Sequence, residues 1–217
     1  MISFIIPYLD SRKDLFEINK KSLEQQTDKD FEIITVPVTG TNPAEAQNIG
    51  ARQAGGNILV LTSPEVINAI TNVEEMKKLP TKTFWIGHVV EEKKENVPFD
   101  FSRDSLMSVI GIQNGIAARC TKSDWEVWKY FLGVIHKEDY FSIGGIDEDY
   151  MKGIAWEDRD FADRITRSDV KPEFNNKIVG VHLRHSRSYQ DNSPELRKIN
   201  KESYWRKTSE RSLIYGC

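Results

Sequence analysis

The chain has 217 residues, 29% of them charged and 39% hydrophobic, and a formal net charge of −3. This length fits one domain, and the composition is that of a globular protein rather than of a disordered chain or a general nucleic-acid binder. The two cysteines, Cys120 and Cys217, exclude a disulfide framework and a cysteine-based metal site, so we expect a cytoplasmic location. No stretch approaches the roughly 18 apolar residues of a membrane span, and the apolar run at 2–6 ends at Pro7 as in a strand, not a signal peptide.

The first third of the chain alternates apolar runs with amphipathic segments. The runs at 3–6, 31–36 and 58–61 predict buried strands, and the segments at 15–27 and 44–54 predict helices between them. This order is typical of a parallel sheet, whose ligand sites lie at the carboxyl ends of its strands. We therefore expect a site at the loops 7–12, 37–42 and 62–66, although neither a dinucleotide fingerprint nor a P-loop is present.

The remainder of the chain has a less regular pattern. Residues 84–90 and 178–183 predict strands, 106–112 is apolar, and 122–131 and 156–165 predict helices. The last segment, 194–217, predicts a polar helix followed by a loose tail. The residues of this helix that we expect to pack on the body are Ile199, Tyr204 and Trp205.

Charge is distributed in blocks. Residues 138–163 carry nine acidic residues against two basic ones, whereas residues 182–217 carry eight Lys or Arg against four acidic residues. Such blocks are commonly solvated faces, but an acidic block followed by a basic one also suits a site that handles a cation and a phosphate.

A glycine pair and a group of carboxylates form the densest candidate for chemistry. Gly144 and Gly145 allow a ligand or another segment to come close. Asp158 is expected in the first turn of a helix, on the buried face with Phe161 and Ile165. There, backbone N–H groups stabilise its ionised form and the neighbouring acids Glu157 and Asp160 raise its proton affinity, a balance that suits a general base. Alternatively, these three acids are ordinary helix-start residues.

A second candidate consists of residues that could bind a metal ion. His182 and His185 lie at the end of a predicted strand, and Glu65 follows another strand. Oxygen ligands at this position suit Mn²⁺ or Mg²⁺, and a histidine together with a carboxylate favours Mn²⁺. Residues i and i+3 of a straight strand face opposite ways, so joint ligation requires the chain to turn at Leu183 or Arg184. Alone, the two histidines are a weak motif, and a lone glutamate after a strand is usually solvent-exposed.

Four segments in the same order over residues 3–190 resemble one family. They are Phe-Ile-Ile-Pro7-Tyr8 with Arg12, Asn42-Pro-Ala-Glu-Ala-Gln-Asn48-Ile-Gly50, Trp156-Glu157-Asp158-Arg-Asp160 and Arg184-His185-Ser186-Arg187. The third resembles a Trp-Gly-Gly-Glu-Asp-Asp-Asp segment and the fourth matches Arg-His-Ser-Arg. Together they resemble the inverting GT-A-fold glycosyltransferases, family 2-like and most similar to the β-1,4-galactosyltransferase branch.

This resemblance implies an α/β GT-A fold with a Rossmann-like, mixed but mostly parallel central sheet flanked by helices. The whole of 1–217 would be one domain, with a nucleotide-binding half at 1–66, an acceptor and metal half at 84–190, and a C-terminal helix and tail at 194–217. The implied activity is metal-dependent, inverting hexosyl transfer from a nucleotide-sugar, by expectation a UDP-sugar, to a hydroxyl of a glycan acceptor.

The resemblance also implies roles for single residues. Asp158 aligns with the catalytic base of the family, and His185 aligns with the histidine that ligates the metal. His182 aligns with a position where the galactosyltransferases have a methionine ligand. The residues expected to hold the acceptor are Trp156, Glu157, Gly144, Gly145 and Asp147. Those expected around the nucleotide-sugar are Pro7, Tyr8, Asp10, Arg12, Val38 and Asn48.

The chain departs from the family pattern at two places. The family's Asp-x-Asp metal motif aligns with Ser63-Pro64-Glu65, so only Glu65 keeps a carboxylate there. The acidic pair that follows the second strand in many relatives is replaced by Pro37-Val38.

Two other functions stay open. A sugar-nucleotide nucleotidyltransferase shares the layout, but it is expected to have a first loop rich in Gly and Lys or Arg, whereas residues 7–12 contain Arg12 alone of these. A non-catalytic carbohydrate-binding domain would account for Ser63 in place of an aspartate. No motif specifies the sugar, the acceptor or the oligomeric state.

Overall fold

One mixed sheet forms the centre of the computed structural model, which describes residues 1–91, 100–106, 118–120, 131–185 and 193–215. Its eight strands in this part of the chain are β1 (Ile2–Tyr8), β2 (Phe31–Pro37), β3 (Ile58–Thr62), β4 (Val66–Asn68), β5 (Thr83–Glu91), β6 (Ala118–Cys120), β7 (Leu132–His136) and β8 (Lys171–His182). The order is β2-β1-β3-β7-β5-β8-β4, with β6 paired to β5. The pairs β1/β2, β1/β3 and β5/β8 are parallel, and the other pairs are antiparallel.

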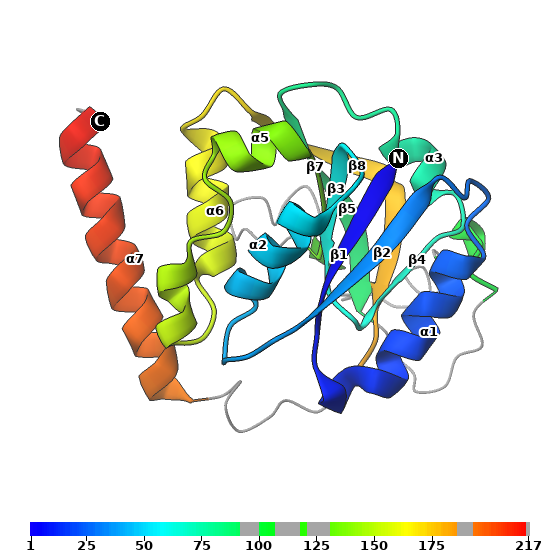
Figure 1. Ribbon diagram of the computed structural model, residues 1–217, viewed down its shortest axis with the longest axis horizontal. Helices are drawn as coiled ribbons and strands as arrows, with labels where there is room; N and C mark the ends of the chain where they lie inside the picture. The colour runs from blue at the N-terminus through cyan, green and yellow to red at the C-terminus, as the bar shows by residue number, and fades with distance from the viewer. Residues whose placement is uncertain (92–99, 107–117, 121–130, 186–192, 216–217) are drawn as a thin grey trace.

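Helices cover both faces of this sheet (Figure 1). On one face, α1 (Lys13–Glu24) and α3 (Asn72–Met76) pack on alternate side chains of β1, among them Phe4. On the other, α2 (Ala44–Gln53), α5 (Lys137–Ser142) and α6 (Glu157–Thr166) cover Ile5 and its neighbours. Because both faces of β1 and β3 are buried, these strands are continuous apolar runs rather than alternating ones.

A close contact of α2 with β1 sets the position of the loop between β2 and α2. A Cβ atom at Gly50 would lie 2.6 Å from Cγ2 of Ile5, so the glycine lets the helix backbone approach the strand. The helix therefore begins close to the carboxyl end of β1, and the loop before it lies at the same edge of the sheet.

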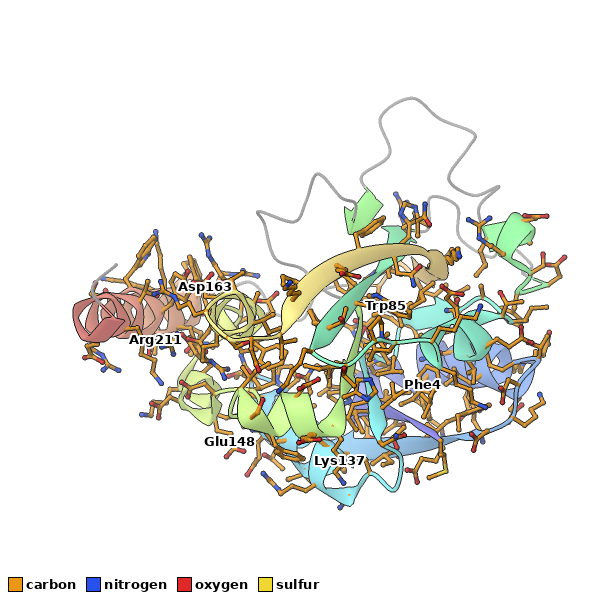
Figure 2. All side chains as sticks on the ribbon, turned by 90° about the horizontal axis from the view of Figure 1, so that it is seen from above. Phe4, Trp85, Lys137, Glu148, Asp163 and Arg211 are labelled. Carbon is orange, nitrogen blue, oxygen red and sulfur yellow. The ribbon has the colours of Figure 1, made fainter. Side chains whose placement is uncertain are left out.

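The C-terminal helix α7 (Pro194–Tyr215) lies beside α6, at the end of the molecule opposite α1 (Figures 1 and 2). Tyr204 is buried as predicted, but Ile199 and Trp205 are 43% and 50% exposed. The helix continues to Tyr215, and the last two residues of the expected tail lie outside the described residues. The expected packing of Ile199 and Trp205 is wrong, and polar contacts described below attach α7 instead.

The element predictions hold for the parallel strands and their helices, with shifts at the ends. The first strand continues through Pro7 to Tyr8, and the last strand begins at Lys171 rather than at 178. Strands β4, β6 and β7 were not predicted, and the helix expected at 122–131 lies outside the described residues except for its last residue. Within the described part of the chain, no helix combines the length and apolar character needed to cross a bilayer.

Candidate functional site

A cavity of about 450 Å³ lies at the carboxyl ends of β1, β2 and β3. All three loops singled out in the sequence contribute to its wall, which is where the ligand site of such a sheet is expected. The predicted site residues found in this wall are Pro7, Arg12, Val38, Glu65 and His185.

Glu65, His182 and His185 come together beside this cavity as one cluster. Oε1 of Glu65 lies 3.5 Å from Nε2 of His182 and 3.6 Å from Nε2 of His185. The three atoms that could ligate a metal lie within 4.8 Å of one another. The structure thus places the three predicted metal ligands next to each other, although they are far apart in the sequence.

Strand pairing explains this convergence. β4 begins directly after Glu65 and runs antiparallel to the end of β8, with Val66 opposite His182. The backbone N–H of Leu183 then donates a 2.8 Å hydrogen bond to the carbonyl of Glu65. Since β8 ends at His182, the chain is free to turn, and both imidazoles reach the same carboxylate.

The electrostatics of the cluster suit a cation. Burial raises the pKa of the Glu65 carboxyl, but the hydrogen bonds and charges of His182 and His185 outweigh burial and hold this pKa well below its ordinary value. Nδ1 of His182 is buried without a hydrogen-bond partner among the described residues. Two imidazole nitrogens and one carboxylate oxygen form a donor set that fits Mn²⁺, and Glu65 and His185 face the cavity.

The start of α6 lies beside the same cavity. Nδ2 of Asn42 donates a 2.7 Å hydrogen bond to Oε2 of Glu157, and Oγ1 of Thr41 donates one of 2.7 Å to the carbonyl of Gly153. Both Thr41 and Ile154 line the cavity. The segment predicted to hold the acceptor is therefore attached to the loop that follows β2.

Glu157 and Asp158 form a carboxylate pair in the first turn of α6. Burial, followed by the charge of Asp158, raises the pKa of Glu157 to about 7. Asp158 is half-buried, and its Oδ1 accepts a 2.7 Å hydrogen bond from the backbone N–H of Arg159. The prediction that Asp158 is buried with Phe161 and Ile165 is only partly met, because Phe161 and Ile165 are fully buried while Asp158 is half-buried. Asp160, on another side of the helix, is the fully buried acid of this turn.

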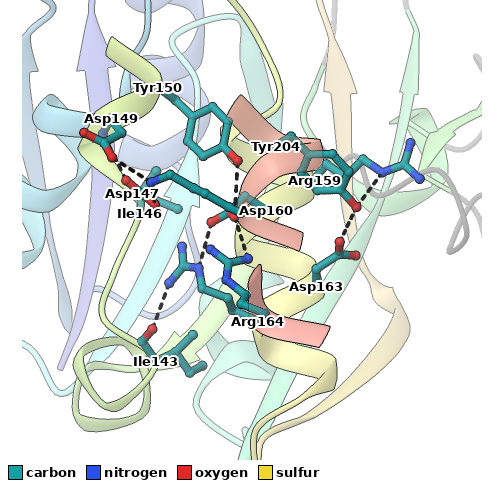
Figure 3. Close-up of polar contacts among 12 residues, drawn as sticks. Ile143, Ile146, Asp147, Asp149, Tyr150, Arg159, Asp160, Asp163, Arg164 and Tyr204 are labelled. Carbon is teal, nitrogen blue, oxygen red and sulfur yellow. Dashed lines mark hydrogen bonds and ion pairs between the residues drawn. The ribbon is translucent and has the colours of Figure 1, made fainter. Parts of the chain in front are cut away.

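Asp160 belongs to a polar cluster between α6 and α7 (Figure 3). Its carboxylate lies 2.7 Å from Nε of Arg164 and 2.7 Å from Nη1 of Arg211, and it accepts a 3.2 Å hydrogen bond from the hydroxyl of Tyr150. Asp160 was expected to raise the proton affinity of Asp158. Instead, its carboxylate faces Arg211 and helps to attach α7 to α6. The Asp160–Arg164 spacing of four residues on a helix was the signal that could have indicated this.

The backbone just before α6 is left-handed at two residues that are not glycine. Ala155 has φ 58° and Trp156 has φ 76°. Such a conformation is unfavourable for a bulky residue and persists where the surroundings hold it. Here the ring of Trp156 packs 5.2 Å from that of Tyr204, and the guanidinium of Arg159 lies over both rings.

Four predicted sugar-site residues, Asn48, Gly144, Gly145 and Asp147, line a separate cavity of about 390 Å³ beside α2. The side chain of Asn48 donates to the carbonyl of Ile146 and to Glu148, and it accepts from the hydroxyl of Tyr140 and the N–H of Ile146. These bonds use the whole hydrogen-bonding capacity of an asparagine side chain. Asn48 thus anchors a loop, and its contact with a nucleotide-sugar stays a prediction without support from this geometry.

The remaining residues predicted to contact the sugar or the nucleotide also have structural positions that do not test those contacts. Gly145 has φ 65°, and a Cβ atom there would lie 2.7 Å from Oδ1 of Asn48. Asp147 pairs with Lys207 of α7. Tyr8 packs edge-to-face on Phe16, and Asp10 is exposed at the start of the 3-10 helix η1 (Asp10–Arg12). Contacts of these residues with sugars or nucleotides stay predictions.

One charged residue of the cavity wall was missed by the sequence analysis. Arg197 of α7 lines the cavity together with Glu65 and His185. It belongs to the basic block at 182–217, but composition alone did not indicate which of those eight residues reaches the site.

Neither a protein-family model nor a curated protein sequence matches the chain. Solved structures do match it at low identity. S. aureus TarS in complex with UDP-GlcNAc is 9% identical with a TM-score of 0.62, and the match covers 91% of this chain and 64% of that one. GalNAc-T7 with UDP, GalNAc and Mn²⁺ is 12% identical with a TM-score of 0.63, covering 94% of this chain and 49% of that one.

A Drosophila β-1,4-galactosyltransferase 7 mutant, in complex with manganese, UDP-Gal and xylobiose, is 12% identical with a TM-score of 0.59. This match covers 92% of the present chain and 79% of that one. The chain is thus shorter than these glycosyltransferases and spans less than two thirds of the TarS and GalNAc-T7 chains. The sheet order, the cavity at the strand ends and these matches together show that the chain has the GT-A fold of glycosyltransferases.

Proposed function

We propose that the protein is a metal-dependent, inverting glycosyltransferase that moves a sugar from a UDP-sugar to a hydroxyl of a glycan acceptor. The observation that carries this proposal is the convergence of two groups of residues. Glu65 and His185 lie in the cavity wall, and Glu157 is hydrogen-bonded to the loop that forms another part of that wall. The complexes of TarS, GalNAc-T7 and galactosyltransferase 7 with UDP or UDP-sugars support this class of donor.

The donor would lie in the cavity at the ends of β1, β2 and β3. Pro7, Arg12 and Val38 would form the nucleotide part of the wall. Glu65, His182 and His185 would hold a divalent cation, for which their donor set suits Mn²⁺. Such an ion supplies Lewis-acid neutralisation of the charge that develops on a departing diphosphate.

Asp158 would act as the general base. It would take the proton of the acceptor hydroxyl as the hydroxyl oxygen bonds to the anomeric carbon and the bond from that carbon to the diphosphate breaks. This single displacement inverts the anomeric configuration, and a positioned general base contributes typically 10²–10⁴ in rate. Glu157, adjacent and hydrogen-bonded to Asn42, and the ring of Trp156 would hold the acceptor sugar.

A donor screen tests the proposal. The protein is incubated with Mn²⁺, a panel of nucleotide-sugars and saccharide acceptors, and the released nucleotide and the product are measured. We expect UDP release from at least one UDP-sugar, loss of release in EDTA, and a product of inverted configuration. Glycan binding without UDP release from any donor would instead identify a non-catalytic carbohydrate-binding domain. Sugar-phosphate-dependent pyrophosphate release from a nucleoside triphosphate would identify a nucleotidyltransferase.

A further inference from the structure

The cavity wall carries more positive than negative charge. Among the described residues that line it, Arg12 and Arg197 are cationic at all ordinary pH values, and Glu65 is the one carboxylate. The carboxylate of Glu65 lies next to the two histidines, with Oε1 at 3.5 and 3.6 Å from Nε2 of His182 and of His185. The rest of the wall therefore attracts an anion even before a metal binds.

The position of Arg197 is set by the residues on either side of it in α7. The carbonyl of Leu196 accepts a 3.2 Å hydrogen bond from the N–H of Ile154. One turn later, the fully buried Asn200 donates from Nδ2 to the carbonyls of Tyr150 and Ala155, at 2.9 and 2.8 Å. These bonds hold the start of α7 against the backbone that leads into α6.

Arg197 also acts electrostatically on the start of α6. Its charge opposes the rise in the pKa of Glu157 that burial and Asp158 produce. Arg197 thus lines the cavity that contains Glu65 and lies within electrostatic reach of Glu157. This is the region in which a leaving group and an acceptor would meet.

Two hydroxyl groups in the same wall have no partner. Oγ1 of Thr62 and Oγ of Ser63 are buried without a hydrogen-bond partner among the described residues, and both residues line the cavity. A buried polar group without a partner is destabilising. Each hydroxyl can donate one hydrogen bond to an acceptor that comes within reach, and the cavity is next to both residues.

We propose that Arg197 binds the diphosphate of the donor directly and that Thr62 and Ser63 donate hydrogen bonds to the same group. This inference rests on the proposed function and names a contact for its leaving group. A diphosphate carries several negative charges and many acceptor oxygens, which match a guanidinium and two hydroxyls. Ser63 contributes no negative charge where the Asp-x-Asp pattern has a carboxylate, so the anion meets less repulsion there.

Calorimetric titration with inorganic pyrophosphate, UDP and uridine, in EDTA and in Mn²⁺, tests the role of Arg197. In EDTA we expect Arg197→Ala to weaken pyrophosphate and UDP binding by about 10- to 100-fold, as expected for a charge-assisted contact. Uridine binding should not change, and Arg197→Lys should restore part of the loss. Affinities of the Ala variant within about twofold of wild type in both media would overturn the proposal.

Lys198→Ala is the matched control. Lys198 is the next residue of α7, and its side chain is 74% exposed and 3.7 Å from Glu202. Removing it changes the net charge as Arg197→Ala does, but we expect pyrophosphate affinity to stay within about twofold of wild type. An equal loss in both variants would show a general charge effect and would also overturn the assignment to Arg197.

Thr62→Val and Ser63→Ala test the hydroxyl groups by two independent readouts. Because each hydroxyl is buried without a partner, we expect the ligand-free variants to melt at the same temperature as wild type or higher. Pyrophosphate affinity should fall about threefold or more. Lower melting temperatures with unchanged affinity would assign the hydroxyls a purely structural role.

The pyrophosphate arm separates this inference from the proposed function. Wild-type protein that binds pyrophosphate through Arg197, but neither UDP nor any nucleotide-sugar, would overturn the proposed function and keep the anion site. If the wild-type protein transfers sugar and Arg197→Ala binds UDP and pyrophosphate as well as wild type does, the proposed function stands and the anion site is overturned. No pyrophosphate binding by the wild type would overturn the anion site.

Discussion

Asn42 donates a 2.7 Å hydrogen bond to Glu157, a residue 115 positions later in the chain. This bond joins the loop after β2 to the start of α6 and brings the Glu157–Asp158 pair to the side of the cavity. Since Asn42 is itself buried, the bond is shielded from water. This contact therefore holds the pair next to the loop that follows β2, and its titration and chemistry are open to direct tests.

We expect Glu157→Gln to reduce the pH dependence of folding stability. Burial and Asp158 raise the pKa of Glu157 from 4.5 to about 7, so the folded protein retains a proton that the unfolded chain loses. The stability linked to this group is present below pH 4.5 and is lost as pH rises toward 7. Between these limits, wild type should lose on the order of 1–3 kcal/mol relative to the variant. Urea unfolding at several pH values measures this, and a constant difference between the two proteins would contradict the pKa.

Asp158→Asn is expected to lower transfer by at least about a hundredfold, because the amide cannot accept the proton of the acceptor hydroxyl. Affinity for the donor should stay nearly unchanged, since Asp158 is assigned to the acceptor side. Steady-state transfer and UDP binding measure the two effects. Asp169→Asn, whose side chain is 69% exposed and pairs with Lys82, serves as the control. Turnover near that of wild type would refute the assignment of the base.

His185→Ala should weaken Mn²⁺ binding and lower metal-dependent activity together, because it removes one of the three proposed ligands. His136→Ala is the matched control, since His136 bonds to the carbonyl of Leu79 and lies in β7 outside the cluster. Titrating Mn²⁺ into the protein without substrate measures the affinity for the metal. Assays over a range of Mn²⁺ concentrations measure the dependence of activity on the metal. Stimulation by Mn²⁺ that survives intact in His185→Ala would remove His185 from the metal site.

Asp160→Asn should destabilise the protein by about 3–5 kcal/mol, because it leaves two arginines facing a buried site without their anion. Chemical unfolding measures the change. Arg206→Ala, which breaks an exposed pair with Glu210 on the same helix α7, should cost less than about 1 kcal/mol. Similar losses in both variants would contradict a special role of Asp160 in attaching α7.

Local patterns were sufficient for the parallel part of the sheet. The apolar runs of β1, β2 and β3 and the amphipathic segments between them predicted both the strands and the edge at which the cavity lies. The apolar runs of β1 and β3 reflect burial on two faces, which a short window of sequence reports. The metal candidates followed from residue types at strand ends, and strand pairing then placed their ligand atoms within 4.8 Å.

Tertiary packing determined which side chains at the start of α6 and on α7 are buried and which reach the cavity, and short windows of sequence do not show this. Sequence alone identified a group of acids at a helix start, but only packing against α7 determined that Asp160 is fully buried while Asp158 is half-buried. The same packing brought Arg197 to the cavity and left Trp205 exposed. These outcomes depend on partners that lie tens of residues away in the chain. Their positions follow from how whole elements pack against one another, which the spacing of residues within one element does not encode.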